Sequence, residues 1–163
     1  KKIIVYAPTF RKDDHVLYNA IKELIDVIDF NQYHLVLKLH PLTTFHIHDS
    51  RIIEDHQYTS LEFFHVANYI ITDYSAVIFE ASLLNKPLFF YAFDYEEYMR
   101  KRSMYIDYLH DLPGTIFQSP KSLIESLNHP QRYDIQSFAH KMIAKPQTTY
   151  TQDIVRFMME QWK

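Results

Sequence analysis

Polar side chains that could hold an anionic ligand follow three apolar runs of this sequence. Arg11 follows the first run, Lys38 and His40 the second, and Ser75 the third. Arginine and lysine are positively charged at neutral pH, and a histidine with an ordinary pKa near ~6.5 can both donate and accept a proton. Phosphoryl transfer needs such groups, because cations and hydrogen-bond donors stabilise the negative charge that develops in the transition state.

The spacing of apolar residues predicts the elements that position these side chains. Strands are expected at 3–7, 34–39, 69–71 and 87–91, with a short strand at 52–53 and an edge strand at 114–117. Helices are expected at 16–28, from Ser60, at 75–84, at 96–100, from Pro120, at 135–143 and at 151–162. This alternation predicts an α/β fold over residues 1–163: one Rossmann-like domain whose parallel sheet carries helices on both faces.

Ligands of such sheets bind beyond the carboxyl ends of the strands, where the polar residues above are found. Strand alternation predicts that Lys38 and His40 point the same way. Ser75 is expected at a helix N-cap, where free N–H groups favour phosphate. Asp73 would repel phosphate, so it is expected to cap the helix or to accept from ribose hydroxyls. A simpler alternative stays open, in which Asp73 and Ser75 only shape a turn, Arg11 is a solvated charge and His40 is a loop residue.

Composition excludes several classes of protein and site. The net charge of -3 argues against a general nucleic-acid binder, and the absence of cysteine excludes disulfides and thiolate chemistry. The single glycine, Gly114, excludes a glycine-rich phosphate loop, and no apolar stretch approaches the ~20 residues of a membrane-spanning helix. His46, His48 and Asp49 lack the spacing of a known metal motif, so no metal site is predicted. Five tyrosines are expected only to fill the core and its rim: Tyr91, Tyr95, Tyr98, Tyr105 and Tyr108.

Four segments resemble, in order and spacing, the CDP-glycerol glycerophosphotransferases of teichoic acid synthesis. They are Tyr6-Ala7-Pro8-Thr9-Phe10-Arg11, Lys38-Leu39-His40-Pro41, Ile71-Thr72-Asp73-Tyr74-Ser75 and Asn85-Lys86-Pro87-Leu88-Phe89-Phe90-Tyr91. The resemblance extends over about residues 3–118. One departure is at Arg102-Ser103-Met104-Tyr105, where the family usually has glycine after the arginine.

The resemblance implies that this chain is the C-terminal, donor-binding half of a GT-B fold, with an N-terminal acceptor domain absent from it. In such an enzyme a hydroxyl of a lipid-linked teichoic acid or capsule-type polymer attacks the β-phosphorus of a CDP-polyol, and CMP leaves. CDP-glycerol is the first expectation and CDP-ribitol the second. His40 is implied as the catalytic residue. The implied donor-binding residues are Thr9, Arg11, Lys38, Thr72, Asp73, Tyr74, Ser75 and Arg102.

The remaining expectations follow from the same resemblance. The isolated domain should bind the donor without turnover, because the base that deprotonates the acceptor lies in the other domain. The full-length protein is expected in the cytoplasm, peripheral to the inner face of the membrane. No cofactor is firmly implied, and the participation of a divalent cation is left open. The alternative kept for the fold is a GT-B glycosyltransferase or epimerase domain that binds a UDP-sugar.

Overall fold

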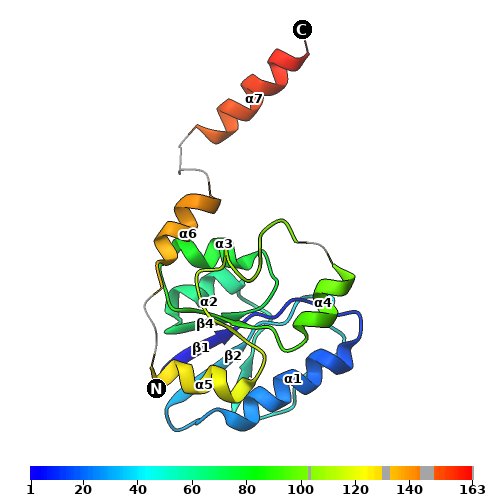
Figure 1. The fold of residues 1–163 in the computed structure, drawn as a ribbon, viewed down its shortest axis with the longest axis vertical. Helices are drawn as coiled ribbons and strands as arrows, with labels where there is room; N and C mark the ends of the chain where they lie inside the picture. Colours follow the sequence, from blue (N-terminus) through cyan, green and yellow to red (C-terminus); the bar gives the residue numbers. More distant parts are fainter. Residues whose placement is uncertain (103, 130–132, 144–148, 163) are drawn as a thin grey trace.

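The computed structural model describes residues 1–102, 104–129, 133–143 and 149–162, and its centre is a parallel sheet of six strands in the order β3-β2-β1-β4-β5-β6 (Figure 1). The strands are β1 (Lys2–Tyr6), β2 (Tyr33–Leu37), β3 (Ile52–Glu54), β4 (Tyr69–Thr72), β5 (Leu88–Tyr91) and β6 (Ile116–Phe117). The residues of β4 and β5 are all buried, as expected for the middle of a parallel sheet covered on both faces.

Helices cover both faces of the sheet (Figure 1). Their bounds are α1 (Asp14–Val27), α2 (Ser60–Val66), α3 (Val77–Leu83), α4 (Tyr95–Lys101), α5 (Pro120–Asn128), α6 (Ile135–Met142) and α7 (Tyr150–Gln161). One core cluster joins α1 and α5 to the strand residues Ile4, Leu35 and Ile71. A second cluster joins α2, α3 and α6 to Val5 and Ile70 on the opposite face. The prediction of a Rossmann-like sheet with helices on both faces is therefore confirmed.

Local sequence explains where three of the helices begin. Asp13 caps α1 by accepting from the His15 N–H, and Thr59 and Glu62 form a reciprocal capping box at the start of α2. Pro120 opens α5 directly after its N-cap residue, Ser119, where the missing proline N–H has no helical partner to lose. The predicted helix from Pro120 is thus found where it was expected.

Two predictions about element ends were wrong. The helix expected to begin at Ser75 begins at Val77 with Ala76 at its N-cap, so Ser75 lies one residue ahead of the cap. Ser75 Oγ instead accepts from the Val77 N–H at 3.3 Å, which forms a turn before the helix. β2 ends at Leu37, so regular strand alternation does not extend to Lys38 and His40.

Gly114 precedes the edge strand β6 and permits close packing there. A Cβ atom at this position would lie 2.7 Å from the Leu88 carbonyl oxygen and 3.1 Å from the Phe90 ring. Any side chain would therefore push β6 away from β5. The only glycine of the chain serves strand packing, not phosphate binding.

The C-terminal helix α7 extends away from the body of the domain (Figure 1). Among its exposed apolar side chains are Ile154, Val155, Phe157, Met158 and Met159. No residue of α7 is buried, whereas α1 and α5 each bury one face against the sheet. Among the described residues, no helix combines the length and hydropathy that a membrane span requires.

Candidate functional site

The order in which the chain adds strands reverses between β1 and β4: β2 and β3 are added on one side of β1, and β4 to β6 on the other. β1 and β4 therefore lie side by side although β2 and β3 separate them in sequence. In doubly wound sheets, the crevice beyond the carboxyl ends of such a strand pair is the usual ligand site. The segment Ala7 to Arg11 follows β1, and Asp73 to Ser75 follows β4. The candidate site is therefore built around these two segments.

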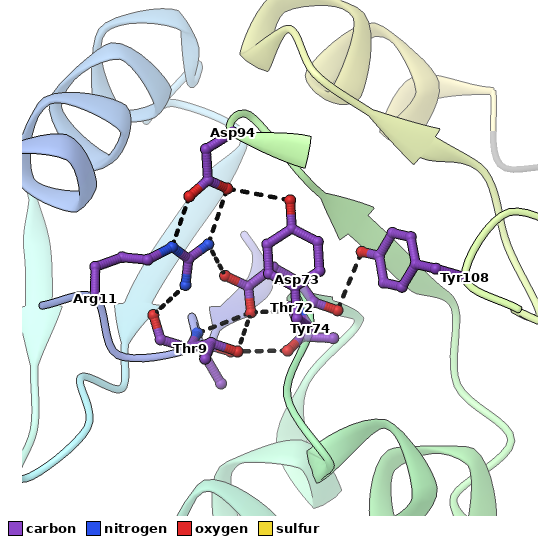
Figure 2. A network of polar contacts seen from close by, with 8 residues as sticks. Thr9, Arg11, Thr72, Asp73, Tyr74, Asp94 and Tyr108 are labelled. Carbon is purple, nitrogen blue, oxygen red and sulfur yellow. Dashed lines mark hydrogen bonds and ion pairs between the residues drawn. The ribbon is translucent and has the colours of Figure 1, made fainter. Parts of the chain in front are cut away.

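Asp73 lies at the centre of a buried polar network (Figure 2). Its side chain is fully buried, and Oδ1 accepts from the Thr9 amide at 2.8 Å, from Thr9 Oγ1 at 2.5 Å and from the Tyr74 amide at 2.7 Å. Oδ2 accepts from the Arg11 guanidinium at 2.9 Å. Of the two roles predicted for Asp73, the helix cap was wrong, since α3 has no side-chain cap and the carboxylate binds the loop after β1. Acceptance from ribose hydroxyls stays a prediction.

Arg11 joins the two strand ends to the loop after β5. It donates from Nε and Nη2 to Asp94 at 2.7 and 3.0 Å, and from Nη1 to the Thr9 carbonyl at 2.6 Å. Only 8% of Arg11 is exposed, and its guanidinium lies over the Tyr74 and Tyr98 rings. Burial lowers its pKa, but the hydrogen bonds and charges of Asp94 and Asp73 outweigh this effect and raise the pKa above its usual value.

Aromatic side chains pack against the network. Tyr74 is stacked on Tyr98 with ring centroids 3.7 Å apart, and its hydroxyl donates to Asp94 at 3.1 Å. The Tyr108 hydroxyl donates to the Asp73 carbonyl oxygen at 3.2 Å (Figure 2). Burial raises the pKa of both Tyr74 and Tyr108, so these hydroxyls stay protonated as donors.

Thr72 completes the connection between β4 and β1. Its side chain is fully buried, and Oγ1 donates to the Ala7 carbonyl oxygen at 2.8 Å. We call the set Thr9, Arg11, Thr72, Asp73, Tyr74 and Asp94 the buried hub. The other five side chains are bonded to one another, and Thr72 is bonded to the backbone between them, at Ala7. Because these side chains are largely shielded from solvent, the hub fixes the shape of the strand ends.

Lys38 is also buried and engaged, away from the hub. Its Nζ donates to the Asp55 carbonyl at 2.6 Å, to Asp55 Oδ1 at 2.8 Å and to the Tyr58 carbonyl at 2.6 Å. An ammonium group has three N–H donors, so these contacts occupy all of them. The prediction that Lys38 and His40 point the same way was wrong, because Lys38 is buried against residues 55–58 whereas His40 is exposed.

His40 is exposed at the carboxyl end of β2, beside the Phe10 ring at a centroid distance of 5.9 Å. The Leu42 amide donates to His40 Nδ1 at 3.1 Å. A neutral ring that accepts at Nδ1 carries its proton on Nε2. His40 can therefore offer an Nε2–H donor to a ligand that lies beyond the strand ends.

A cavity of about 210 Å³ opens between the segment after β1 and helix α4. Arg102 lines this cavity, as do Lys12 and Lys101. Lys101 pairs with Glu97, whereas Lys12 and Arg102 form no ion pair within the described part of the chain. Phe10 and Tyr98 add aromatic surface. Asp13, Asp94 and Glu97 also line the cavity, and Arg11 and Asp94 belong to the buried hub as well. The cavity thus combines the unpaired positive charges of Lys12 and Arg102 with aromatic surface and with carboxylates.

The sequence-predicted residues therefore fall into separate places. Thr9, Arg11, Thr72, Asp73 and Tyr74 meet in the buried hub, and Ser75 is half-buried next to it. Three residues lie outside the hub: Lys38 binds Asp55 and Tyr58, His40 is exposed beyond the carboxyl end of β2, and Arg102 lines the cavity that Arg11 also borders.

Sequence reasoning missed Asp94, Lys12 and Lys101. Asp94 follows β5 by three residues, so the rule that selected the other strand ends would have found it. Tyr98 and Tyr108 were expected to fill the core, yet they also enclose the hub. Tyr105 was expected in the core or at its rim but is fully exposed.

A family model described as CDP-Glycerol:Poly(glycerophosphate) glycerophosphotransferase matches residues 1–159. The chain belongs to this family. It is 33% identical to the teichoic acid glycerol-phosphate primase of Bacillus subtilis, an alignment that covers 97% of this chain and 43% of the primase. It is also 33% identical to the teichoic acid poly(ribitol-phosphate) polymerase of Bacillus spizizenii, covering 86% of this chain and 25% of that protein.

Solved structures agree with this family assignment. The wall teichoic acid polymerase TagF, in a crystal soaked with CDPG, aligns with a TM-score of 0.68 at 30% identity and covers 99% of this chain. A UDP-GlcNAc 2-epimerase from Neisseria meningitidis shares the fold at 16% identity with a TM-score of 0.54 over 98% of this chain. The chain spans 42% of the TagF chain and 43% of the B. subtilis primase, so it corresponds to less than half of either relative.

Proposed function

We propose that this chain binds the CDP portion of a CDP-polyol in an enzyme that transfers polyol phosphate to a hydroxyl of a lipid-linked teichoic acid or capsule-type polymer, releasing CMP. The observation that carries this proposal is the family match over residues 1–159. Glycerol phosphate is the expected group, since the family model describes a glycerophosphotransferase and a matching relative is a teichoic acid glycerol-phosphate primase. Ribitol phosphate is the second candidate, because a relative of equal identity is a ribitol-phosphate polymerase.

The donor is proposed to lie at the carboxyl ends of the strands, between His40 and the cavity beside α4. Lys12 and Arg102 supply positive charge for the diphosphate, and Ser75 supplies a partly exposed hydroxyl. The hub residues of the original prediction are assigned a positioning role, because their polar atoms are already bonded within the protein. Arg11 in particular is paired with two carboxylates and contributes no net positive charge to the site.

The proposed reaction forms one bond to phosphorus and breaks another. The acceptor hydroxyl oxygen attacks the β-phosphorus, the bond from that phosphorus to the CMP oxygen breaks, and the acceptor proton goes to a base on the other domain. Negative charge grows on the departing CMP, so an Nε2–H donor from His40 lowers the barrier most if it reaches that oxygen. The Leu42 amide at Nδ1 holds the ring in the tautomer this role requires.

The partner proposed for this domain is an N-terminal acceptor domain of the same protein, as the coverage of the relatives suggests. Helix α7 is a suitable contact for it, because a helix that projects from the body with exposed Phe157, Met158 and Met159 needs an apolar surface to cover it. The assembled enzyme is proposed to act at the inner face of the membrane, where a lipid-linked acceptor is anchored.

Isothermal titration calorimetry of this chain tests the donor assignment. CDP-glycerol, CDP-ribitol, CMP and UDP-N-acetylglucosamine are titrated under the same conditions. Binding of the CDP-polyols and CMP, with much weaker binding of the UDP-sugar, is expected. Preference for the UDP-sugar would overturn the proposal and support the glycosyltransferase or epimerase alternative.

A further inference from the structure

A cluster of two histidines and one glutamate lies on the segment that joins β2 to α2. His46 comes from the loop after β2, Glu54 is the last residue of β3, and His56 follows two residues later. One potential ligand atom from each residue lies within 4.8 Å of the others, and within the described ranges these are the residues that meet that criterion. The cluster shares no residue with the hub or with the cavity.

Both imidazoles face the same carboxylate oxygen. His46 Nδ1 lies 2.7 Å and His56 Nε2 2.9 Å from Glu54 Oε1, and the two rings are nearly perpendicular at a centroid distance of 5.6 Å. A cation that replaced the ring protons at this point would meet two nitrogen lone pairs and one oxygen. Imidazole nitrogen with a carboxylate oxygen is a ligand set that divalent zinc and neighbouring transition metals use in proteins.

Glu54 is held in place by the protein backbone. Its second oxygen, Oε2, accepts from the Ile47 amide at 2.9 Å, and its side chain is only 12% exposed. Such a bond orients a metal-binding carboxylate and leaves its other oxygen free for the ion. The histidine side chains are 63% and 60% exposed, so the opposite side of the cluster is open to water, which would fill the remaining coordination position.

The cluster joins two stretches of chain that lack regular structure. His46 lies in the long loop after β2, and His56 lies between Asp55 and Tyr58, the two residues that Lys38 binds. A bound ion would therefore add a further connection across the segment 38–58, beside the bonds from Lys38 to Asp55 and from the Ile47 amide to Glu54.

From this geometry we infer that His46, Glu54 and His56 form a binding site for a divalent transition metal ion of the zinc type. The site holds the loop after β2 against β3. It stabilises the folded protein, since an ion that binds the folded state and not the unfolded chain shifts the equilibrium toward folding. Sequence reasoning overlooked it because His46 was considered with His48, whereas its partners come from β3 and the residues beyond.

Calorimetric titration of this chain with zinc chloride tests the inference, using four proteins: the unaltered chain, His46→Ala, His56→Ala and His48→Ala. His48 is the matched control, because it is exposed and two residues from His46 but lies outside the cluster. The exposed histidines can be replaced without disturbing the core, and circular dichroism verifies that each variant is folded.

One zinc ion per chain is expected, with an increase in the melting temperature on saturation. Loss of a residue that only hydrogen-bonds a metal ligand weakens metal binding by about 10–100-fold. His46→Ala and His56→Ala remove a ligand itself and should weaken zinc binding by at least as much, whereas His48→Ala should bind zinc as the unaltered chain does. The inference is overturned if zinc does not bind, if both cluster variants retain full affinity, or if the control loses affinity equally. The test measures metal binding alone, so its result does not depend on whether the chain binds a CDP-polyol.

Discussion

Arg11 and Lys38 are buried cations, whereas Lys12 and Arg102 are cations at the open edge of the same domain. Arg11 is held by Asp73 and Asp94, and Lys38 by Asp55 and two carbonyl groups. Lys12 and Arg102 line a cavity and have no ion-pair partner among the described residues. Charge near a strand end is therefore not sufficient for ligand binding. A cation that the fold places beside carboxylates stabilises the folded domain, whereas a cation without such partners can bind a ligand.

His40→Ala should have the largest effect on activity and almost none on folding, because the side chain is exposed. In an enzyme that contains this domain and its acceptor domain, polymer formation should fall by about 10²–10⁴-fold, the usual contribution of a general acid. The free energy of unfolding should change by less than about 0.5 kcal/mol. His34→Ala, an exposed histidine of β2, is the control. Unchanged activity in His40→Ala would remove this residue from the mechanism.

Asp73→Asn should have the largest effect on stability. Asparagine replaces one acceptor oxygen by an N–H donor, so the bond from Arg11 or those from Thr9 and Tyr74 are lost, while Arg11 keeps its pair with Asp94. Each hydrogen bond lost from a charged group costs about 1.5–3 kcal/mol. Urea denaturation measures the loss. Asp107→Asn, which alters an exposed pair with His110, is the control and should change stability far less. Similar values for the two variants would mean that the hub is not a structural centre.

Arg102→Ala should weaken donor binding without changing stability. A hydrogen bond to a charged group contributes about 1.5–3 kcal/mol, which corresponds to about 10–150-fold in the CDP-glycerol dissociation constant. Calorimetry measures this change. Arg100→Ala, on the exposed side of α4 and outside the cavity, is the control and should bind normally. Equal losses in both variants would indicate a diffuse charge effect and not a contact.

The smallest effect among these predictions is a change in the pKa of Asp55 in Lys38→Met. The hydrogen bond from Lys38 holds the pKa of Asp55 below its usual value. A lowered folded-state pKa contributes stability that is present above the unfolded pKa near ~3.9 and is lost as the pH falls through the folded value. In Lys38→Met the Asp55 pKa, followed by NMR, should rise toward its usual value. A pKa that stays low would assign the shift to the Tyr58 and Gln57 amides instead.

Local patterns in the sequence were sufficient to predict the order of strands and helices. The run Ile3-Ile4-Val5 is enough to predict a strand, and the spacing of apolar residues in α1 is enough to predict a helix. Pro120 marks the start of α5 because proline fits the first position of a helix. The position of Ser75 was less predictable. A serine after a strand is equally suited to a cap and to the turn before it, and the choice depends on how β4 leads into α3.

The site was harder to predict, because partners decide the role of each side chain. Nothing local to Arg11 shows that Asp73 and Asp94 will enclose it, and nothing local to Lys38 shows that residues 55–58 will occupy its three donors. The rule for parallel sheets predicted that the residues after β1 and β4 lie together, as they do in the hub. It could not separate the side chains that build that region from those that remain open to a ligand.

The hub also has a consequence for how the chain folds. Arg11 bonds to residues 62 and 83 positions away along the chain, so its contacts require β1, β4 and β5 to be aligned first. Contacts of this range close large loops and are expected to form late in folding. Asp73→Asn should therefore accelerate unfolding far more than it slows refolding, as measured by stopped-flow kinetics. The hub would then stabilise the protein mainly by slowing its unfolding, so that the strand ends stay assembled after the fold has formed.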